Sequence, residues 1–381
     1  PDRDDYAAKS FVASAKRIIL TEENAHRYTP TNIAELRRSP FYSKWKAAME
    51  TEIAALNAYR TWRFVNLDKK FKRITLRWVY KIKFEDGILN KFKARLVARG
   101  FTQRPGLDYD PNGISAPVAR ASTFKTVLAH GAKHKHYFGS FDVKSAYLLA
   151  ALDYDVYARL PYGVVPDKGE NSLKLLKSLY GLKQAGFNWN KKFTATLQTV
   201  GFRQSDIDPC LFIYKKGTDV IYVVLWVDDG MVSTNNKALW HKIERKIHGI
   251  TPLGSELGHD LDWLLGMKIF YNRTTGILRI SQKSKINSLL ERYGMQECNP
   301  QPLPMPTHEK LRSDGPQTPG EKRKVADLAR KTSAGRIVVY DDLIKYCREI
   351  IGSVGYLACW GRPDVRQAVY YLARYQINPS L

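Results

Sequence analysis

The strongest pattern in the chain lies at residues 220–230, which read VIYVVLWVDDG. The first eight of these residues are all apolar, which is typical of a buried β-strand and far short of the about 20 residues that a helix needs to span a bilayer. Asp228-Asp229-Gly230 is a turn signal, and Met231-Val232 then resumes the apolar pattern. The stretch predicts a β-hairpin that carries two adjacent carboxylates where its strands meet.

A third aspartate ends another apolar strand, because residues 137–143 read YFGSFDV and deliver Asp142. Clustered carboxylates repel one another unless a cation lies between them, and carboxylate oxygens are ligands that Mg²⁺ prefers. Two such ions about 3.5–4 Å apart can activate a 3′-hydroxyl and stabilise a leaving pyrophosphate. An ordinary solvated turn is the competing interpretation of Asp228-Asp229-Gly230 alone. The order of the three aspartates is that of a polymerase palm, with one aspartate followed about 85 residues later by a pair on a hairpin.

Helical spacing appears on both sides of these strands. It covers residues 40–56, 122–133, 174–200 and 340–374, and Gly181 and Gly186 interrupt the third of these segments. Residues 1–38 are polar and weakly periodic, which indicates a leader or linker. Four prolines between residues 300 and 306, followed by a charged stretch to residue 336, indicate a second linker.

The charge of the chain favours a polyanionic partner, nucleic acid before an anionic membrane. The 381 residues carry 61 Lys plus Arg against 37 Asp plus Glu, a net charge of +24. Twelve basic residues lie between Lys69 and Arg104, against only Glu85 and Asp86. Strand-like apolar spacing in this segment predicts a basic hairpin that binds phosphates in a salt-dependent way. A merely basic globular protein is the alternative on charge alone.

The four cysteines lie far apart, at Cys210, Cys298, Cys347 and Cys359, and no pair has the short spacing of a zinc site. Without a secretory signal, we interpret them as reduced cysteines of an intracellular protein. A hydrophobic content of 44% is enough to build an interior. The chain begins with Pro1, so we expect a fragment or a processed product.

The motifs around the three aspartates resemble those of copia-type reverse transcriptases. Residues 141–148 (FDVKSAYL) resemble the first catalytic block of that family, residues 178–185 (SLYGLKQA) its second signature, and residues 226–229 (WVDD) its third. Further blocks lie upstream, at residues 91–101 and 116–118, and downstream, at residues 265–267 and 362–365. All of these blocks occur in the family's order. Trp226 stands where the family usually has tyrosine, which places a larger ring near the primer terminus.

The resemblance implies an α+β right-hand polymerase, with basic fingers, a palm of antiparallel sheet and helices, and a C-terminal helical thumb or connection. On this basis we divide the chain into four parts. They are a linker or leader at 1–38, fingers and palm at 39–299, a proline-rich and charged linker at 300–336, and the C-terminal helical segment at 337–381.

The same resemblance implies that Asp142 and Asp228 are ligands of two Mg²⁺ ions, which Mn²⁺ could replace, and that Asp229 completes the catalytic cluster. Tyr147 falls where the family has an aromatic ring beneath the sugar of the incoming nucleotide, and that ring would collide with a ribose 2′-hydroxyl. Core packing at the start of a helix is the other interpretation of Tyr147.

Several further residues are implied to bind the nucleotide. Lys183 and Gln184 would line the nucleotide or template pocket, although the N-terminus of a glycine-broken helix is a competing interpretation. The candidates to clamp the triphosphate, by a bidentate contact from arginine or as a point charge from lysine, are Lys81, Lys83, Lys93 and Arg95.

These features lead us to expect an RNA-directed DNA polymerase that uses an RNA template, a DNA or tRNA primer and deoxynucleoside triphosphates. Expected partners are the integrase and ribonuclease H regions of the same polyprotein, with no membrane, in cytoplasmic virus-like particles or the nucleus. The chain stops at Leu381 without a four-carboxylate region, so we expect no ribonuclease H activity from it. A catalytically silent nucleic-acid-binding protein is the rival function, and a nuclease that uses the same aspartates is a weaker third.

Overall fold

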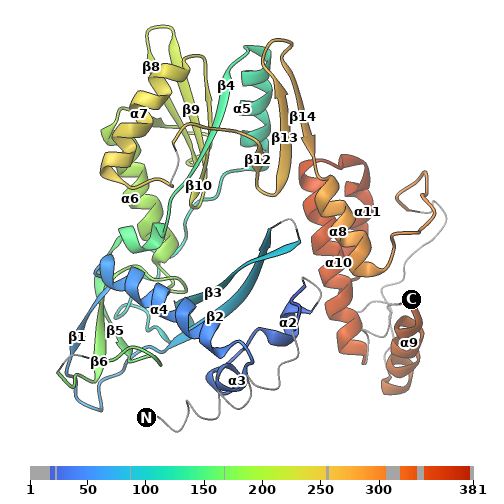
Figure 1. The fold of residues 1–381 in the computed structure, drawn as a ribbon. Coiled ribbons are helices and arrows are strands. Elements are labelled where there is room, and N and C mark those ends of the chain that lie inside the picture. The colour runs from blue at the N-terminus through green and yellow to red at the C-terminus, as the bar shows by residue number, and fades with distance from the viewer. Residues whose placement is uncertain are drawn as a thin grey trace.

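The fold combines helices with antiparallel sheets (Figure 1). The computed structural model describes residues 18–21, 24–85, 87–166, 168–254, 257–305, 318–332 and 339–377. The paired strands of the four sheets are all antiparallel, so the predicted α+β class is confirmed. Among the described helices, none is both long and apolar enough to cross a membrane.

The central sheet, at the top of Figure 1, has six strands in the order β11-β4-β10-β9-β8-β7. Its strands are β4 (Tyr137–Asp142), β7 (Arg203–Gln204), β8 (Leu211–Lys216), β9 (Asp219–Trp226), β10 (Asp229–Thr234) and β11 (His259–Asp260). The predicted hairpin is confirmed as β9 and β10, and Ile221, Val223 and Val224 on β9 are fully buried. Burial of these apolar side chains is what favours this strand at the centre of the sheet.

Three helices pack against the central sheet and share its core: α5 (Ala121–Lys133), α6 (Ala185–Thr199) and α7 (Lys237–Ile250). Each contributes a large aromatic side chain to that core, namely Phe124, Trp189 and Trp240, which are at most 2% exposed. Helical spacing correctly predicted α5. It was wrong for residues 174–184, because β6 (Ser172–Lys177) forms there and α6 begins only at Ala185.

The basic lobe, at the bottom of Figure 1, comprises residues 24–98 and 151–177. It holds the ribbon of β2 (Leu76–Glu85) and β3 (Ile88–Ala98), and a sheet of β1 (Trp62–Val65), β6 and β5 (Ala151–Arg159). Trp78, Tyr80 and Ile82 alternate along one face of β2 and pack toward α4 (Tyr42–Ala58). The lysines of the ribbon therefore lie on its other face, because side chains alternate along a strand.

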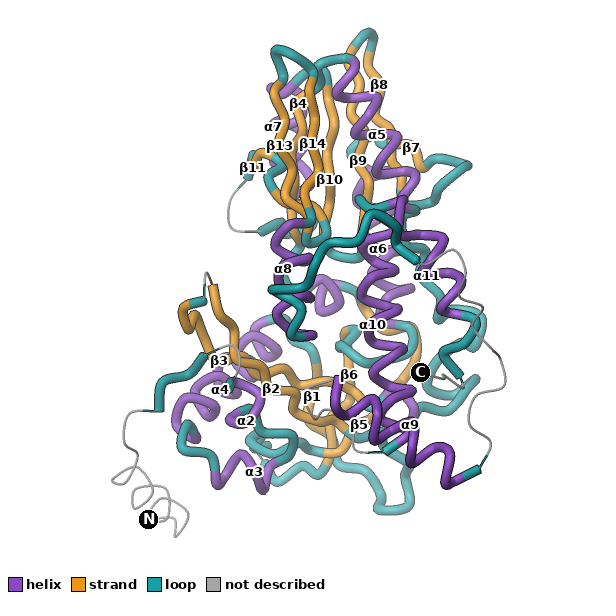
Figure 2. Tube along the Cα trace, turned by 90° about the vertical axis from the view of Figure 1, so that its right-hand side faces the viewer, coloured by secondary structure: helices purple, strands orange, loops and turns teal. Residues whose placement is uncertain are grey.

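The C-terminal part begins with the sheet β12 (Trp263–Leu264), β13 (Met267–Asn272) and β14 (Ile277–Ser281), beside α5 in Figure 1. Figure 2 shows the helices that follow: α8 (Lys283–Tyr293), α9 (Pro319–Thr332), α10 (Tyr340–Trp360) and α11 (Arg366–Ala373). The predicted helical region at 340–374 is therefore present as two helices. Three short 3₁₀ turns also occur, at Gly100–Thr102 (η1), Ala146–Leu149 (η2) and Pro363–Val365 (η3).

Two segments predicted as linkers contain packed helices where the structure describes them. In the N-terminal segment, α2 (Ala25–Tyr28) and α3 (Ile33–Arg38) form, and Leu36 is fully buried. In the second segment, Ala326 and Ala329 of α9 are buried against Tyr340 and Leu343 of α10. Residues 1–17, 22–23, 306–317 and 333–336 of the predicted linkers lie outside the described residues. The division into four parts stays a prediction.

Candidate active site

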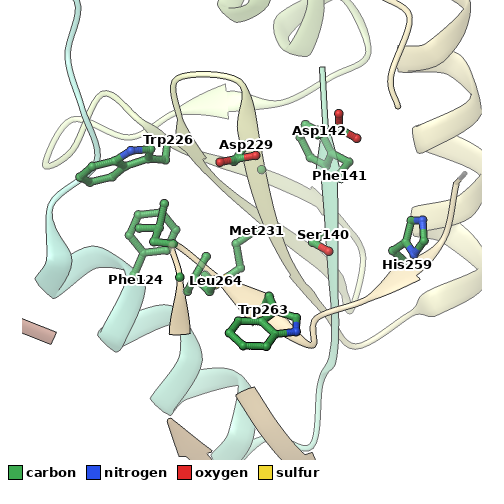
Figure 3. Close-up of a pocket in the computed structure, with 13 residues that line it drawn as sticks. Phe124, Ser140, Phe141, Asp142, Trp226, Asp229, Met231, His259, Trp263 and Leu264 are labelled. Atoms are coloured by element: carbon green, nitrogen blue, oxygen red, sulfur yellow. The ribbon is translucent and has the colours of Figure 1, made fainter. Parts of the chain in front are cut away.

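The three aspartates predicted from the sequence lie at one end of the central sheet. Asp142 is the last residue of β4 and Asp229 the first of β10, and the two are direct partners across the ladder. Directly opposed residues of antiparallel strands point to the same face. Figure 3 shows Asp142 and Asp229 on these neighbouring strands, with Phe124, Leu264 and Trp263 further along the same pocket. Asp228 precedes Asp229 in the turn.

The turn that carries Asp228 is strained and firmly held. Only Val227 and Asp228 separate β9 from β10, and Val227 has a φ of +59°. A positive φ is rare for a β-branched residue and costs of order 1–3 kcal/mol. The Trp189 indole Nε1 donates to the Val227 carbonyl at 2.7 Å, and the Val143 amide donates to the Asp228 carbonyl at 2.9 Å. These two hydrogen bonds fix the turn to α6 and to the end of β4.

The carboxylates interact with one another electrostatically. Burial raises the pKa of Asp229, and the negative charges of Asp228 and Asp142 raise it further. Asp142 is also approached closely from its other side by Gly254, whose amide donates to the Asp142 carbonyl at 2.7 Å. A Cβ on Gly254 would clash with the Asp142 carboxylate, so any larger residue there would force the Asp142 side chain to shift.

Hard oxygen donors that repel one another suit a divalent cation. The structure does not close them around one point, however. Among the described residues, no group of three or more His, Cys, Asp or Glu side chains is gathered closely enough to hold an ion. The donor chemistry of the three aspartates nevertheless fits a divalent metal.

Asp142 and Asp228 line a cavity of about 270 Å³ between the basic lobe and the central sheet, which we call the Lys93 pocket. Lys93 and Arg95 of β3 line it too, so cations and carboxylates lie within one cavity. Burial lowers the pKa of Lys93, and the neighbouring charges of Arg95, Lys83 and Lys91 lower it further. A negatively charged ligand in this pocket would offset that crowding of cations.

The ring of Tyr180 lines the Lys93 pocket, whereas Tyr147 is not among the residues that line it. The Arg95 guanidinium lies 4.8 Å from the centre of the Tyr180 ring, and that ring packs on Tyr147 with 4.7 Å between centres. Burial raises the pKa of Tyr147, and the negative charge of Asp228 raises it further, so the Tyr147 hydroxyl lies in the field of Asp228.

The remaining predicted residues divide into two groups. Lys81 is the direct partner of Lys93 across the β2–β3 ribbon, and Lys83 is the partner of Lys91, so these lysines share one face. Neither Lys81 nor Lys83 lines the Lys93 pocket.

Gln184 and Lys183 are directed elsewhere. Gln184 is 4% exposed, its Nε2 donates to the Asp108 carbonyl at 2.9 Å, and its Oε1 accepts from the Gln103 Nε2 at 2.9 Å. The Lys183 ammonium lies 5.6 Å from the centre of the Tyr109 ring. Neither residue lines the Lys93 pocket, and Gln184 is the N-cap residue of α6, in line with the competing interpretation.

A second cavity, of about 300 Å³, contains Asp142 and Asp229 and is called the Trp263 pocket (Figure 3). Phe124, Trp226 and Trp263 form much of its apolar wall. The sequence did not single out Trp263, Phe124 or the Glu52 of the Lys93 pocket, because their places depend on elements far apart in the chain. The nearby block at residues 265–267 was the one signal that pointed to this region.

Comparison with known proteins agrees with the sequence motifs. Residues 59–307 match the family model described as "Reverse transcriptase (RNA-dependent DNA polymerase)". The chain is 30% identical, over 92% of its length, to the Retrovirus-related Pol polyprotein from transposon TNT 1-94 of Nicotiana tabacum, and covers 25% of that protein. It is 33% identical, over 88% of its length, to the polyprotein from transposon RE2 of Arabidopsis thaliana, and covers 21% of it.

A more distant relative is the Transposon Ty1-JR2 Gag-Pol polyprotein of Saccharomyces cerevisiae, 28% identical over 76% of this chain and 15% of that protein. The chain thus spans a quarter or less of these relatives. Among solved structures, a foamy viral protease-reverse transcriptase in complex with double-stranded DNA aligns with 89% of this chain and 49% of that one. The identity is 12% and the TM-score 0.36, too low to carry an argument.

The family model covers well over half of the chain and includes all three aspartates. The resemblance seen in the sequence is therefore confirmed, and the α+β architecture agrees with a right-hand polymerase. The chain belongs to the reverse transcriptase (RNA-dependent DNA polymerase) family.

Proposed function

We propose that this chain copies an RNA or DNA template by transferring nucleotides from deoxynucleoside triphosphates to the 3′ end of a primer. The observation that carries the proposal is the composition of the Lys93 pocket. It combines Asp142 and Asp228, which can hold divalent metal, with Lys93 and Arg95, which can hold a triphosphate. Membership of the reverse transcriptase family supports the same reaction, and enzymes of this family generally use divalent metal ions.

Asp142 and Asp228 would hold two Mg²⁺ ions, with Asp229 completing the acidic cluster, and Mn²⁺ could replace them. When bound, such ions supply Lewis acidity at the phosphate and favour deprotonation of the primer 3′-hydroxyl. The firmly held turn keeps Asp228 next to the end of β4, so the ligands need little rearrangement of the backbone. Preorganised charge of this kind lowers a barrier because it needs no reorganisation during the reaction.

Lys93 and Arg95 would bind and orient the triphosphate. Arg95 can make a bidentate contact with a phosphate, while Lys93 acts as a point charge. Tyr180 lies under the Arg95 guanidinium and restricts its position. Lys81 and Lys83, on the same face of the ribbon, would add long-range attraction rather than direct contact.

Tyr147 would select deoxynucleotides. Its ring is buttressed by Tyr180 and lies in the field of Asp228. A ring fixed in this place would exclude a ribose 2′-hydroxyl by collision.

In the whole polyprotein, we propose that the partners are the template, a DNA or tRNA primer, and the integrase and ribonuclease H regions. The similarity to Pol polyproteins supports this arrangement. We place the reaction in cytoplasmic virus-like particles, with the nucleus as a second location.

Primer extension on an RNA template tests the proposal. The wild-type chain should extend a primer in Mg²⁺, whereas Asp228→Asn should lower the rate about 10³-fold, because a metal ligand contributes several kcal/mol to the transition state. Asp206→Asn is the matched control, since its side chain is 91% exposed and lies in neither pocket of the aspartates.

Binding of primer–template should persist in all three proteins. Full activity of Asp228→Asn would exclude this residue as a metal ligand. Tight binding without extension by the wild type would favour the silent binding protein.

A further inference from the structure

A second strongly basic cavity lies apart from the three aspartates. It has a volume of about 280 Å³ and shares no residue with the Lys93 or Trp263 pockets. We call it the Lys70 pocket. Six cations and one carboxylate, Asp108, line it, and the cations are Lys69, Lys70, Lys72, Arg73, Arg104 and Arg159.

One wall of the Lys70 pocket is built along the edge of a sheet. Ile74 forms a parallel bridge with Ala158, next to the end of β5. The Ile74 amide donates to the Tyr157 carbonyl at 2.8 Å, and the Arg159 amide donates to the Ile74 carbonyl at 3.0 Å. This pairing brings Arg159 beside the segment that carries the three lysines, although about 90 residues separate them in the chain.

Another part of the lining comes from the loop between Thr102 and Asp108, which the buried Gln184 holds in place. The side chains of Gln184 and Gln103 bond to each other, and Gln184 also binds the Asp108 carbonyl. The Lys183 amide donates to the Gln103 Oε1 at 2.8 Å. Gln184 therefore acts as a positioning residue for the loop that carries Arg104, which explains its burial at the start of α6.

The charges of this pocket are largely uncompensated. Asp108 forms an ion pair with Arg104, whose Nε and Nη2 donate hydrogen bonds to the two carboxylate oxygens at 3.1 and 2.8 Å. The Arg73 Nη2 is held by the carbonyls of Leu67 and Asp68, while its Nε is buried and has no hydrogen-bond partner among the described residues.

The four remaining cations, Lys69, Lys70, Lys72 and Arg159, have no carboxylate within ion-pair distance in the described part of the chain. A preformed group of cations with an unused buried donor calls for an anionic ligand. The buried Nε of Arg73 and the cations around it favour phosphate, which accepts several hydrogen bonds from such donors.

An aromatic ring accompanies the cations. Phe71 lines the cavity, is 42% exposed and packs edge-on against Tyr157, with 5.1 Å between ring centres. Basic surfaces combined with exposed aromatic rings are typical of sites for single-stranded nucleic acid, because unpaired bases can stack on the ring. A single strand can also bend its phosphates into a concave cavity, which the regular backbone of a duplex does less easily.

We propose that the Lys70 pocket binds phosphodiester groups of an unpaired strand of the template, outside the catalytic pocket. This inference rests on the proposed polymerase function, which supplies the template. A free nucleoside triphosphate carries the same phosphate chemistry, so the test includes it as a separate ligand.

The test compares Lys70→Gln/Lys72→Gln with Lys215→Gln/Lys216→Gln, a pair of exposed lysines on β8 at the far end of the central sheet (Figure 1). Fluorescence anisotropy would measure binding of two duplexes without added nucleotide, one blunt and one with a ten-nucleotide template overhang. The pocket variant should bind the overhang duplex about tenfold more weakly than wild type and the blunt duplex equally well. The β8 variant should not distinguish the two.

The salt dependence gives a second readout. On a single strand, each phosphate contact contributes about 0.7 to the slope of log affinity against log salt. Loss of two lysine contacts should therefore make the slope for the overhang duplex shallower by about 1.4 in the pocket variant. An equal loss on both duplexes, or no loss on either, would overturn the proposal. The proposal would also be overturned if the pocket variant bound free dATP more weakly but kept the wild-type preference for the overhang duplex. That result would assign the cavity to nucleotides.

Because this assay needs no catalysis, its result is separate from that of primer extension. A chain that prefers the overhang through these lysines but extends no primer would refute the polymerase function alone. A chain that extends primers but shows no overhang effect in the pocket variant would refute the pocket alone.

Discussion

At the residue scale, Asp229 links the site to the pH dependence of stability. Burial and the charges of Asp228 and Asp142 raise its pKa, so the folded chain binds a proton there more tightly than the unfolded chain does. Ionisation of Asp229 therefore lowers the stability of the folded chain. This loss is absent below the pKa of an aspartate in the unfolded chain, about 3.9, and is fully present above the pKa of Asp229 in the folded chain.

We therefore predict that Asp229→Asn raises the melting temperature of the metal-free chain at pH 7–8. The gain should shrink as the pH falls toward about 4, where Asp229 is neutral in both states. Thermal unfolding in a chelator at several pH values checks this, with Asp206→Asn as the control. A variant that is less stable than wild type at pH 8 would contradict the repulsion within the cluster.

The Tyr147 ring gives a prediction about substrate choice. Tyr147→Ala should lower the preference for deoxynucleotides over ribonucleotides in kcat/KM by about 10–200-fold, the range that a steric pocket supplies. Tyr147→Phe keeps the ring and should keep the preference. Single-nucleotide incorporation with dATP and ATP measures both. If Tyr147→Ala stayed as selective as wild type, Tyr147 would be a packing residue against Tyr180.

The contrast between Asp142 and Gln184 shows what could be predicted from sequence at this scale. Asp142 and Asp228 follow apolar strands, and the strand period places them at a sheet end without further information. A glutamine next to a helix start carries no such signal, because burial of its amide depends on Gln103 and Asp108, about 80 residues earlier. The sequence motif marked Gln184 as important but not the side to which it turns.

At the element scale, the end of α10 packs beside the hairpin of β9 and β10. Trp360 is 8% exposed, and its ring centre lies 5.8 Å from that of Phe124 and 6.4 Å from that of Trp226. The Lys125 ammonium donates to the Cys359 carbonyl at 2.6 Å, and the Tyr356 hydroxyl donates to the Leu265 carbonyl. The end of α10 thus supports β9, the strand that leads into Asp228.

Trp360→Ala should destabilise the chain by about 3–5 kcal/mol, as expected for a buried tryptophan. Trp263→Ala is the matched control, because Trp263 is 53% exposed and its loss should change the free energy of unfolding by about 0.5 kcal/mol or less. Denaturant-induced unfolding measures both variants. Equal stability of the two variants would mean that α10 does not support the central sheet.

The error at residues 174–184 shows where periodicity alone is insufficient. Leu173 and Leu175 are buried and alternate along β6, but the neighbouring Leu176 and Leu179 also fit helical spacing. Short apolar runs of this kind are ambiguous between strand and helix. Pairing with β1 and β5 resolves the ambiguity, and the β1 partners lie more than a hundred positions away in the chain.

At the scale of the whole molecule, the net charge of +24 is not spread evenly. The basic lobe carries the Lys70 pocket and the lysine face of the β2–β3 ribbon, while the central sheet carries the aspartates. The two parts meet at the Lys93 pocket. Composition could predict a nucleic-acid partner, but not that the cations form two separate cavities, because that depends on how segments far apart in the chain pack.

The most direct test of this account is the rate of single-nucleotide incorporation on an RNA template as Mg²⁺ is titrated. We predict that the wild-type chain incorporates the complementary deoxynucleotide only when a divalent ion is present. Asp142→Asn and Asp228→Asn should each lower the rate of incorporation about 10³-fold while retaining salt-sensitive binding of the primer–template. Incorporation that persists in a chelator, or that proceeds at the wild-type rate in either variant, would contradict the assignment of the aspartates. No incorporation by the wild type would contradict the polymerase function itself.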